Sequence, residues 1–167
     1  MQFRPEEANR EVVISTFDDH RCAIAALLPE AEVEHIGSTA VPGALTKGDL
    51  DLLVRIPSSQ FDSAVAALRR RYAVNQPRSW TSQFASFKQE PADEIPVGVQ
   101  LVIAGSKDDA LFLAWRDRLR TDPGLRERFN AFKRGQTGAE PGEYIEAKAR
   151  FIEAELGGGI GGDRDSD

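Results

Sequence analysis

The sequence predicts an α+β fold, in which a small mixed β-sheet with packed helices is followed by a helical C-terminal portion. Strand-like and helical patterns alternate up to residue 104, and only helical patterns follow. The 167 residues, 41% of them hydrophobic, suit one domain with its own core. We expect that domain over residues 1–156. Residues 157–167, rich in glycine and charge, are expected to form a flexible tail because they offer little apolar surface to bury.

Hydrophobic spacing predicts each element of the first half. Residues 5–28 carry apolar side chains near helical spacing, and Pro29 ends that helix. Residues 32–36 and 49–56 are strand-like, and a loop of small residues, 37–43, joins them. A second helix is expected over residues 59–71, with Ser58 or Ser59 as its N-cap.

The second half begins with strands and ends with helices. Residues 80–89 alternate between two faces, and residues 97–104 are apolar and β-branched, so both predict strands. Helices are expected over residues 110–120, 123–134 and 141–156. Pro123 and Pro141 then occupy first-turn positions, where a helix tolerates proline.

Charge and composition exclude several classes of protein. Against 27 acidic residues stand 21 basic ones, a net charge of -6 that argues against non-specific nucleic-acid binding. The N-terminus is polar, unlike a secretory signal, and no apolar run is long enough to cross a bilayer. A single cysteine excludes an internal disulfide framework. We expect a cytoplasmic protein without a nucleic-acid or membrane partner; the oligomeric state stays open.

The chemistry-bearing residues gather between residues 35 and 55. Asp49 and Asp51 lie two apart on a predicted strand, so their carboxylates share one face and suit Mg²⁺. Gly37 lets the backbone approach a phosphate, and Ser38 and Thr39 offer hydroxyl and amide donors to it. Lys47 precedes the acidic pair and would neutralise ligand charge. Taken singly, an Asp-x-Asp at a strand start or a Gly-Ser pair is often only a turn.

The segment Glu34–Gly43, with the sequence EHIGSTAVPG, resembles the signature of the GrpB-like family, a branch of the nucleotidyltransferase superfamily. The similarity continues through residues 47–54 and returns in residues 115–120 and 144–152. In active members of that superfamily a Gly-Ser loop grips a triphosphate, and an Asp-x-Asp pair with a third carboxylate holds two metal ions. The resemblance implies that Gly37 and Ser38 bind a nucleotide and that Asp49 and Asp51 hold metal and support catalysis.

The chain departs from that pattern at two places. GrpB-like proteins commonly carry a hydrophobic residue where Asp49 stands, so the complete acidic pair favours metal binding. The third carboxylate is missing, because the strand over residues 97–104 offers Gly98 and Gln100 instead. Gln100 is therefore the remaining candidate for a catalytic position, although its amide is a poor base and a weak metal ligand.

Three further residues are candidates for substrate binding. His35 stands two residues before Gly37 and is expected on the same face, although a packed strand histidine is an equal alternative. Arg116 and Lys148 match the family's helical motifs, and they would bring positive charge to an anionic ligand.

Two functions follow from this pattern. The first is a Mg²⁺-dependent nucleotidyltransferase that uses a nucleoside triphosphate and acts on a small molecule. The second is a non-catalytic binding module of the same fold, which senses a nucleotide or another phosphorylated metabolite. The pair of Asp49 and Asp51 favours the first function, and the missing third carboxylate favours the second.

Overall fold

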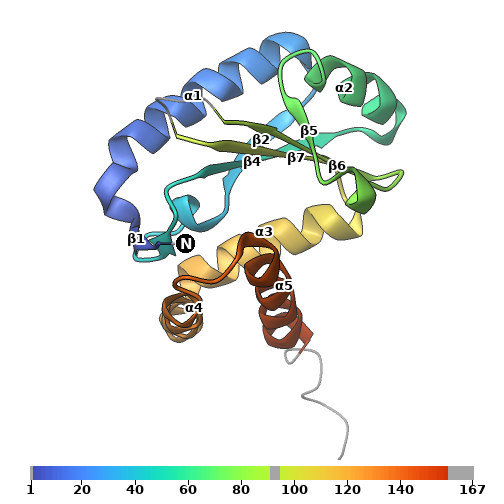
Figure 1. Ribbon diagram of the computed structural model, residues 1–167. Coiled ribbons are helices and arrows are strands. Elements are labelled where there is room, and N and C mark those ends of the chain that lie inside the picture. Colours follow the sequence, from blue (N-terminus) through green and yellow to red (C-terminus); the bar gives the residue numbers. More distant parts are fainter. Residues whose placement is uncertain (1, 91–94, 158–167) are drawn as a thin grey trace, which may run out of the picture.

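In the computed structural model, which describes residues 2–90 and 95–157, helices cover both faces of a mixed five-stranded sheet (Figure 1). The strands are β1 (Arg4–Pro5), β2 (Glu32–Ile36), β3 (Leu45–Thr46), β4 (Leu50–Ile56), β5 (Ala73–Asn75), β6 (Phe84–Gln89) and β7 (Val97–Ile103). The helices are α1 (Arg10–Leu27), α2 (Phe61–Leu68), α3 (Lys107–Thr121), α4 (Pro123–Gly135) and α5 (Pro141–Gly157). The predicted α+β class, with its helical C-terminal portion, is confirmed.

The sheet has the order β2-β4-β7-β6-β5. Only the central pair, β4 and β7, is parallel; the other neighbours are antiparallel. Strand β4 therefore lies between β2 and β7. Each of its residues 51–55 has a register partner on both neighbouring strands. Strand β4, which carries Asp51, therefore lies next to β2, which leads into the Gly-Ser loop, and next to β7, which carries Gln100.

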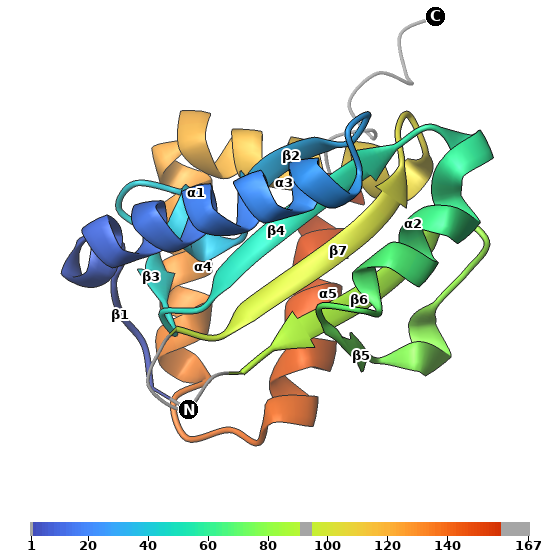
Figure 2. The same cartoon turned by 90° about the horizontal axis from the view of Figure 1, so that it is seen from above.

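One face of the sheet is largely apolar and packs against α1 and α2 (Figure 2). Its four residues from β4 have no exposed surface; they are Leu50, Leu52, Val54 and Ile56. Because side chains alternate along a strand, Asp51, Leu53 and Arg55 must point to the other face. On that face α3 packs against Leu53, and Asp109 of α3 accepts two hydrogen bonds from Arg55. Asp51 thus faces the C-terminal helices.

The three C-terminal helices are joined by an aromatic cluster. Trp115 of α3 meets the ring of Phe129 of α4 edge-on at 5.2 Å, and the ring of Phe151 in α5 lies 4.9 Å from that of Phe132 in α4, tilted by 30°. Trp115 is 9% exposed and Phe129 1% exposed, so this cluster is a second core. It fixes α4 and α5 below the sheet, where their side chains reach the loop after β2.

Several element boundaries differ from those expected. The first helix begins at Arg10 rather than at residue 5, because Arg4–Pro5 pairs with β3 and Glu6–Asn9 forms a 3₁₀ turn. Ser58–Gln60 also forms a 3₁₀ turn, so Gln60 precedes α2 and the expected serine N-cap is wrong. The short strand β5 was not expected, since three residues are too few to show an alternating pattern.

Residues 158–167 lie outside the described part of the chain, so the expected flexible tail stays a prediction. Within the described ranges, no helix is both long and apolar enough to cross a membrane.

Candidate functional site

The Gly-Ser loop begins where β2 ends. Gly37 has a φ of 74°, and Ser38–Ala40 then forms a single 3₁₀ turn. The hydroxyl of Thr39 donates a hydrogen bond of 3.1 Å to the carbonyl of Asp49, just before β4. On the other side of the loop, the side-chain amide of Asn130 in α4 bonds the backbone of Gly43 and Leu45 at 2.9 and 2.8 Å. The loop is therefore held between the acidic strand and a C-terminal helix.

Asp51 occupies a slot between two glycines. It pairs with Ile36 on β2 and with Gly98 on β7. A Cβ atom placed on Gly37 would lie 2.4 Å from Oδ2 of Asp51, and one placed on Gly98 would lie 2.7 Å from Oδ1. Both distances are shorter than any contact between real atoms of these types, so the carboxylate fits here because both neighbours lack side chains.

Burial, reinforced by the charge of Asp49, raises the pKa of Asp51 to about 6. The nearby lysines Lys148, Lys47 and Lys133 oppose that rise. A cation between the two carboxylates would relieve their repulsion.

We expect Gly37→Ala to lower the free energy of unfolding by about 1–3 kcal/mol, because its positive φ is strained for alanine and the new methyl group meets Asp51. Gly105→Ala is the matched control, since Gly105 also has a positive φ (78°) but no atom within 4 Å of the new Cβ. Gly98→Ala tests the clash without the strain. Denaturant unfolding measures the change in stability of each variant. If the site binds a nucleotide with Mg²⁺, titration should show weaker binding in Gly37→Ala and Gly98→Ala but not in Gly105→Ala; equal binding in all three variants would contradict the role of the slot.

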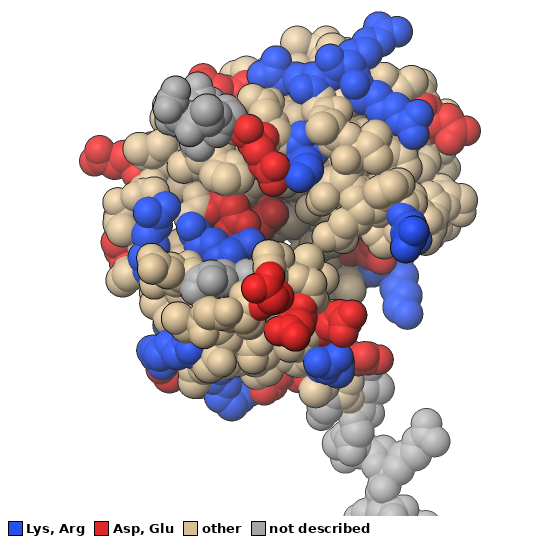
Figure 3. Space-filling model, viewed as in Figure 1, with Lys and Arg blue, Asp and Glu red and all other residues tan. Residues whose placement is uncertain are grey.

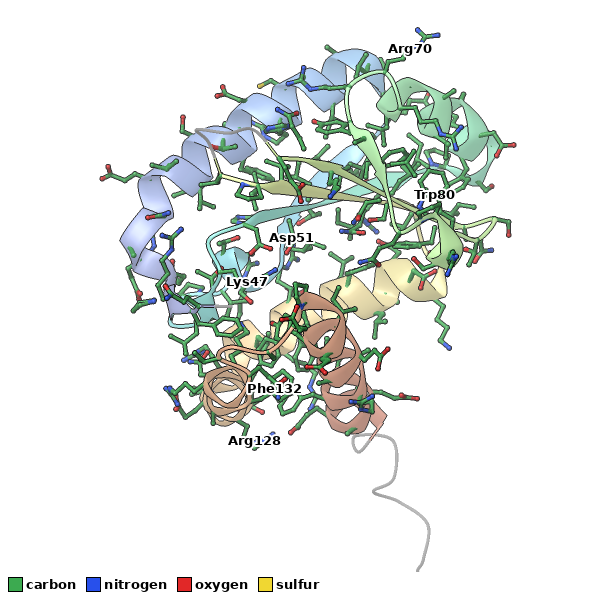
Figure 4. All side chains as sticks on the ribbon, viewed as in Figure 1. Lys47, Asp51, Arg70, Trp80, Arg128 and Phe132 are labelled. Atoms are coloured by element: carbon green, nitrogen blue, oxygen red, sulfur yellow. The ribbon has the colours of Figure 1, made fainter. Side chains whose placement is uncertain are left out.

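Three lysines surround the acidic pair. Lys47 forms an ion pair of 3.0 Å with Asp49, and its ammonium lies 5.9 Å from the centre of the Tyr144 ring. Lys148 comes from the same face of α5 as Tyr144, one turn further on, and lines the cleft with Asp49 and Asp51. Figure 4 shows Lys47 and Asp51 in the space between the sheet and the C-terminal helices.

The third lysine, Lys133 of α4, was not among the residues expected at the site. It is 1% exposed, donates a hydrogen bond of 2.5 Å to the hydroxyl of Ser38 and another to the carbonyl of Leu45, and lies over the Phe129 ring at 4.1 Å. Burial lowers its pKa to about 7. The sequence carries one signal for it: Leu125, Phe129 and Lys133 are spaced by four, so a lysine stands on the apolar stripe of a helix.

Asp49 and Asp51, with Lys47 and Lys148, line a cleft of about 550 Å³, and Lys133 contacts it through the Ser38 hydroxyl. The cleft brings together most of the expected polar residues, namely Ser38, Lys47, Asp49, Asp51, Gln100 and Lys148. Gly37 lines a smaller inner pocket that opens beside Asp51. Figure 3 shows acidic and basic side chains gathered around a hollow in this face of the molecule.

His35 lies on the opposite face of the sheet from Asp51. Its register partner is Leu52, whose side chain belongs to the apolar face, and its ring stacks on Phe17 of α1 at 5.3 Å. Burial, with Arg120 and Arg116 nearby, lowers its pKa to about 4, and its Nε2 is bonded to the Thr39 hydroxyl at 3.0 Å. The expectation that His35 shares the face of the loop is wrong, because strand alternation stops at Ile36 and Gly37 turns the chain.

Thr39 and Arg116 hold the site in place from outside the cleft. The hydroxyl of Thr39 is hydrogen-bonded to the Asp49 carbonyl and to the His35 ring. The guanidinium of Arg116 donates to Glu34 at 2.7 Å, to the carbonyl of His35 at 3.2 Å and to Asp117 at 2.8 Å. Two carboxylates thus neutralise Arg116, which lines the inner pocket rather than the cleft.

The donor set of the cleft fits one Mg²⁺ ion. Asp49 and Asp51 would supply carboxylate oxygens, and Gln100, beside Leu53 on the same sheet face, carries an uncharged amide that lines the same cleft. The described residues contain no group of three or more histidine, cysteine, aspartate or glutamate side chains that could hold a metal ion. Two carboxylates suit a single ion whose remaining ligands come from water and phosphate, but they do not suit a pair of ions.

Comparison with known proteins places most of the chain in one family. A family model described as "GrpB protein" matches residues 10–157. A UPF0157 protein from Vibrio cholerae is 33% identical over 158 residues, which cover 94% of this chain and 82% of the relative. A UPF0157 protein from Deinococcus radiodurans is 32% identical over 142 residues, 81% of this chain and 71% of that protein.

Solved structures show the same fold at lower identity. The crystal structure of the conserved protein GrpB from Enterococcus faecalis aligns with a TM-score of 0.64 at 19% identity, covering 87% of this chain and 95% of that one. The Cid1 poly(U) polymerase with bound MgGTP aligns with a TM-score of 0.55 at 15% identity. This second match covers 74% of the chain and 41% of the polymerase, and it shows a shared fold.

Proposed function

The chain belongs to the GrpB family, and on that premise we propose that its cleft binds a nucleoside triphosphate with one Mg²⁺ ion and transfers the nucleotidyl group to a small molecule. One observation carries the proposal: the carboxylates of Asp49 and Asp51 line the same cleft as Ser38 of the Gly-Ser turn, under the lysines of two C-terminal helices. The fold shared with Cid1, a polymerase seen with bound MgGTP, supports it.

Each group has a separate task in this proposal. Ser38 and the amides of its turn bind phosphate oxygens, and Lys47 and Lys148 neutralise phosphate charge. Lys133 orients the Ser38 hydroxyl. Asp49 and Asp51 would hold Mg²⁺, which supplies charge neutralisation across the phosphates. In the transfer, a hydroxyl oxygen of the acceptor forms a bond to the α-phosphorus, the bond from that phosphorus to pyrophosphate breaks, and the hydroxyl proton leaves to water.

Gln100 favours a second candidate function. Where active transferases place a carboxylate, this chain has an uncharged amide. The third acidic residue that lines the cleft, Glu90, is paired with Lys88, and among the described residues it does not form a metal-binding group with Asp49 and Asp51. A site of this kind binds a nucleotide or another phosphorylated metabolite without transferring it. The protein would then act as a sensor of that ligand.

Isothermal titration with each of the four nucleoside triphosphates, with and without Mg²⁺, tests binding, and pyrophosphate release in the presence of mixed small alcohols tests transfer. The transferase proposal expects Mg²⁺-dependent binding together with pyrophosphate release. Binding without release would support the sensor, and the lack of any nucleotide binding would refute both functions.

We expect Gln100→Glu to tighten Mg²⁺ binding several-fold, because a third carboxylate on the same sheet face adds one negative charge to the donor set. Any pyrophosphate release should rise in the same variant. Gln83→Glu, an exposed position before β6, is the control for the added charge alone. Titration with Mg²⁺ at saturating nucleotide measures the change, and equal affinity in both variants would remove Gln100 from the metal site.

A further inference from the structure

A small pocket opens from the cleft beside Asp51 and lies between the sheet and the C-terminal helices. Its volume is about 160 Å³, against about 550 Å³ for the cleft. Six residues line both spaces and mark where they meet: Ser38, Asp51, Phe112, Gln100, Lys148 and Ile152. A group seated in the inner pocket would therefore lie directly beside the Asp51 carboxylate and the Gly-Ser turn.

The walls of the inner pocket are largely apolar. Leu111, Phe112, Trp115 and Leu119 come from α3, and Phe129 comes from α4. The one charged side chain that lines this pocket and not the cleft is Arg116, which already donates to Glu34 and Asp117. A cavity of about 150 Å³ with aliphatic and aromatic walls holds one benzene molecule. The inner pocket therefore has room for one six-membered ring or a branched aliphatic group of that size.

A nucleobase does not suit these walls. Its ring edges carry several hydrogen-bond donors and acceptors, and each one left without a partner in an apolar pocket weakens binding, because its hydrogen bonds to water are lost. The larger cleft offers polar partners, including Asn75, Gln76 and Lys88. The nucleotide and the inner-pocket ligand are therefore assigned to different spaces that meet at Asp51.

We propose that the inner pocket binds the acceptor, and that this acceptor is a small alcohol or phenol whose apolar part, about the size of one ring, fills the pocket while its hydroxyl points to the cleft at Asp51. The assignment of the ligand as acceptor rests on the proposed function. The existence of a pocket for an apolar ring rests on its walls alone, so the two can fail separately.

Phenol is the probe, and glycerol, which carries hydroxyls but no apolar ring, is the comparison ligand. Titration calorimetry or ligand-observed NMR should show millimolar phenol binding and no glycerol binding. Leu111→Trp adds bulk at the edge of the pocket, where Leu111 is 41% exposed, and should weaken phenol binding at least tenfold. Val12→Trp, at a 54% exposed position on α1, is the matched control and should bind phenol like the parent. Thermal melting verifies that both variants fold.

Equal phenol affinity in Leu111→Trp and Val12→Trp, or no phenol binding by the parent, would overturn the pocket. A second titration, of MgATP into protein saturated with phenol, separates acceptor from nucleobase. Simultaneous binding supports the acceptor assignment, whereas displacement of phenol by MgATP would overturn it by placing the base in this pocket. If phenol binds as expected and no nucleotide binds at all, the pocket stands and the proposed transferase function fails.

Discussion

On the proposed function, Asp51→Asn will abolish the Mg²⁺-dependent part of nucleotide binding and leave the fold intact. Asparagine has the shape of aspartate, so it fits the slot between Gly37 and Gly98. It carries no charge, however, and leaves Asp49 as the remaining carboxylate of the pair. Because Mg²⁺ gives up its hydration water reluctantly, one carboxylate that is already paired with Lys47 should not retain it.

The measurement is a nucleotide titration at fixed protein with and without Mg²⁺, on the parent and on Asp51→Asn. Burial and the charge of Asp49 raise the pKa of Asp51, so its ionised form is unfavourable in the folded state, and the melting temperature of the variant should equal or exceed that of the parent. Asp62→Asn, on the exposed face of α2, controls for the lost charge. If Asp51→Asn binds nucleotide and Mg²⁺ as the parent does, the acidic pair is not a metal site.

Lys133→Met will flatten the pH dependence of stability above neutral pH. The pKa of Lys133 is about 7 in the folded protein and 10.5 ordinarily, since burial disfavours the ammonium and Lys148 and Lys47 add repulsion that Asp49 and Asp51 partly offset. Between these two values the unfolded chain binds more protons than the folded one. The contribution of Lys133 to the free energy of unfolding therefore rises with pH, by at most about 1.4 kcal/mol per pH unit.

Urea unfolding at about pH 7, 8 and 9 measures how the free energy of unfolding changes with pH. The parent should gain stability across the series and Lys133→Met should not. Lys107→Met removes a lysine at an exposed position in the first turn of α3 and should keep the parent's slope. Identical slopes in the parent and Lys133→Met would show that Lys133 keeps its ordinary pKa.

The same variant should bind nucleotide at least tenfold more weakly if the cleft serves a triphosphate, because methionine cannot donate to Ser38 and the hydroxyl loses its orientation. This binding result depends on the proposed function, whereas the slope of stability against pH does not. The two measurements therefore separate the burial of Lys133 from its role in the site.

The sequence was sufficient for the features that depend on local spacing. Alternation in residues 50–56 predicted which face of β4 is core and that Asp51 points away from it, and the structure agrees. The prediction that His35 lies on the same face as Gly37 was wrong. It extended the strand pattern past Ile36 to Gly37, whose positive φ turns the chain.

Lys133 could not be assigned to the site from spacing. Its partner Ser38 lies 95 residues earlier, and only the packing of α4 under the loop brings the two together. Its place on an apolar helix stripe signals burial, but the stripe does not say which polar group meets the ammonium. Similarly, the partners of Asn130 in the loop around Gly43 follow from tertiary packing and not from local sequence.

The slot around Asp51 makes positions 37, 51 and 98 epistatic. A side chain at position 98 and a carboxylate at 51 in this rotamer exclude each other, since the added Cβ would lie 2.7 Å from Oδ1. An evolving sequence that places a side chain at position 98 must therefore first lose or rotate the carboxylate of Asp51, so the order of substitutions at the two positions matters. Position 100 carries no such constraint, because Gln100 already has a side chain on that face. A third acidic side chain can accordingly be gained by substitution at position 100, but not at position 98 as long as Asp51 keeps its present position.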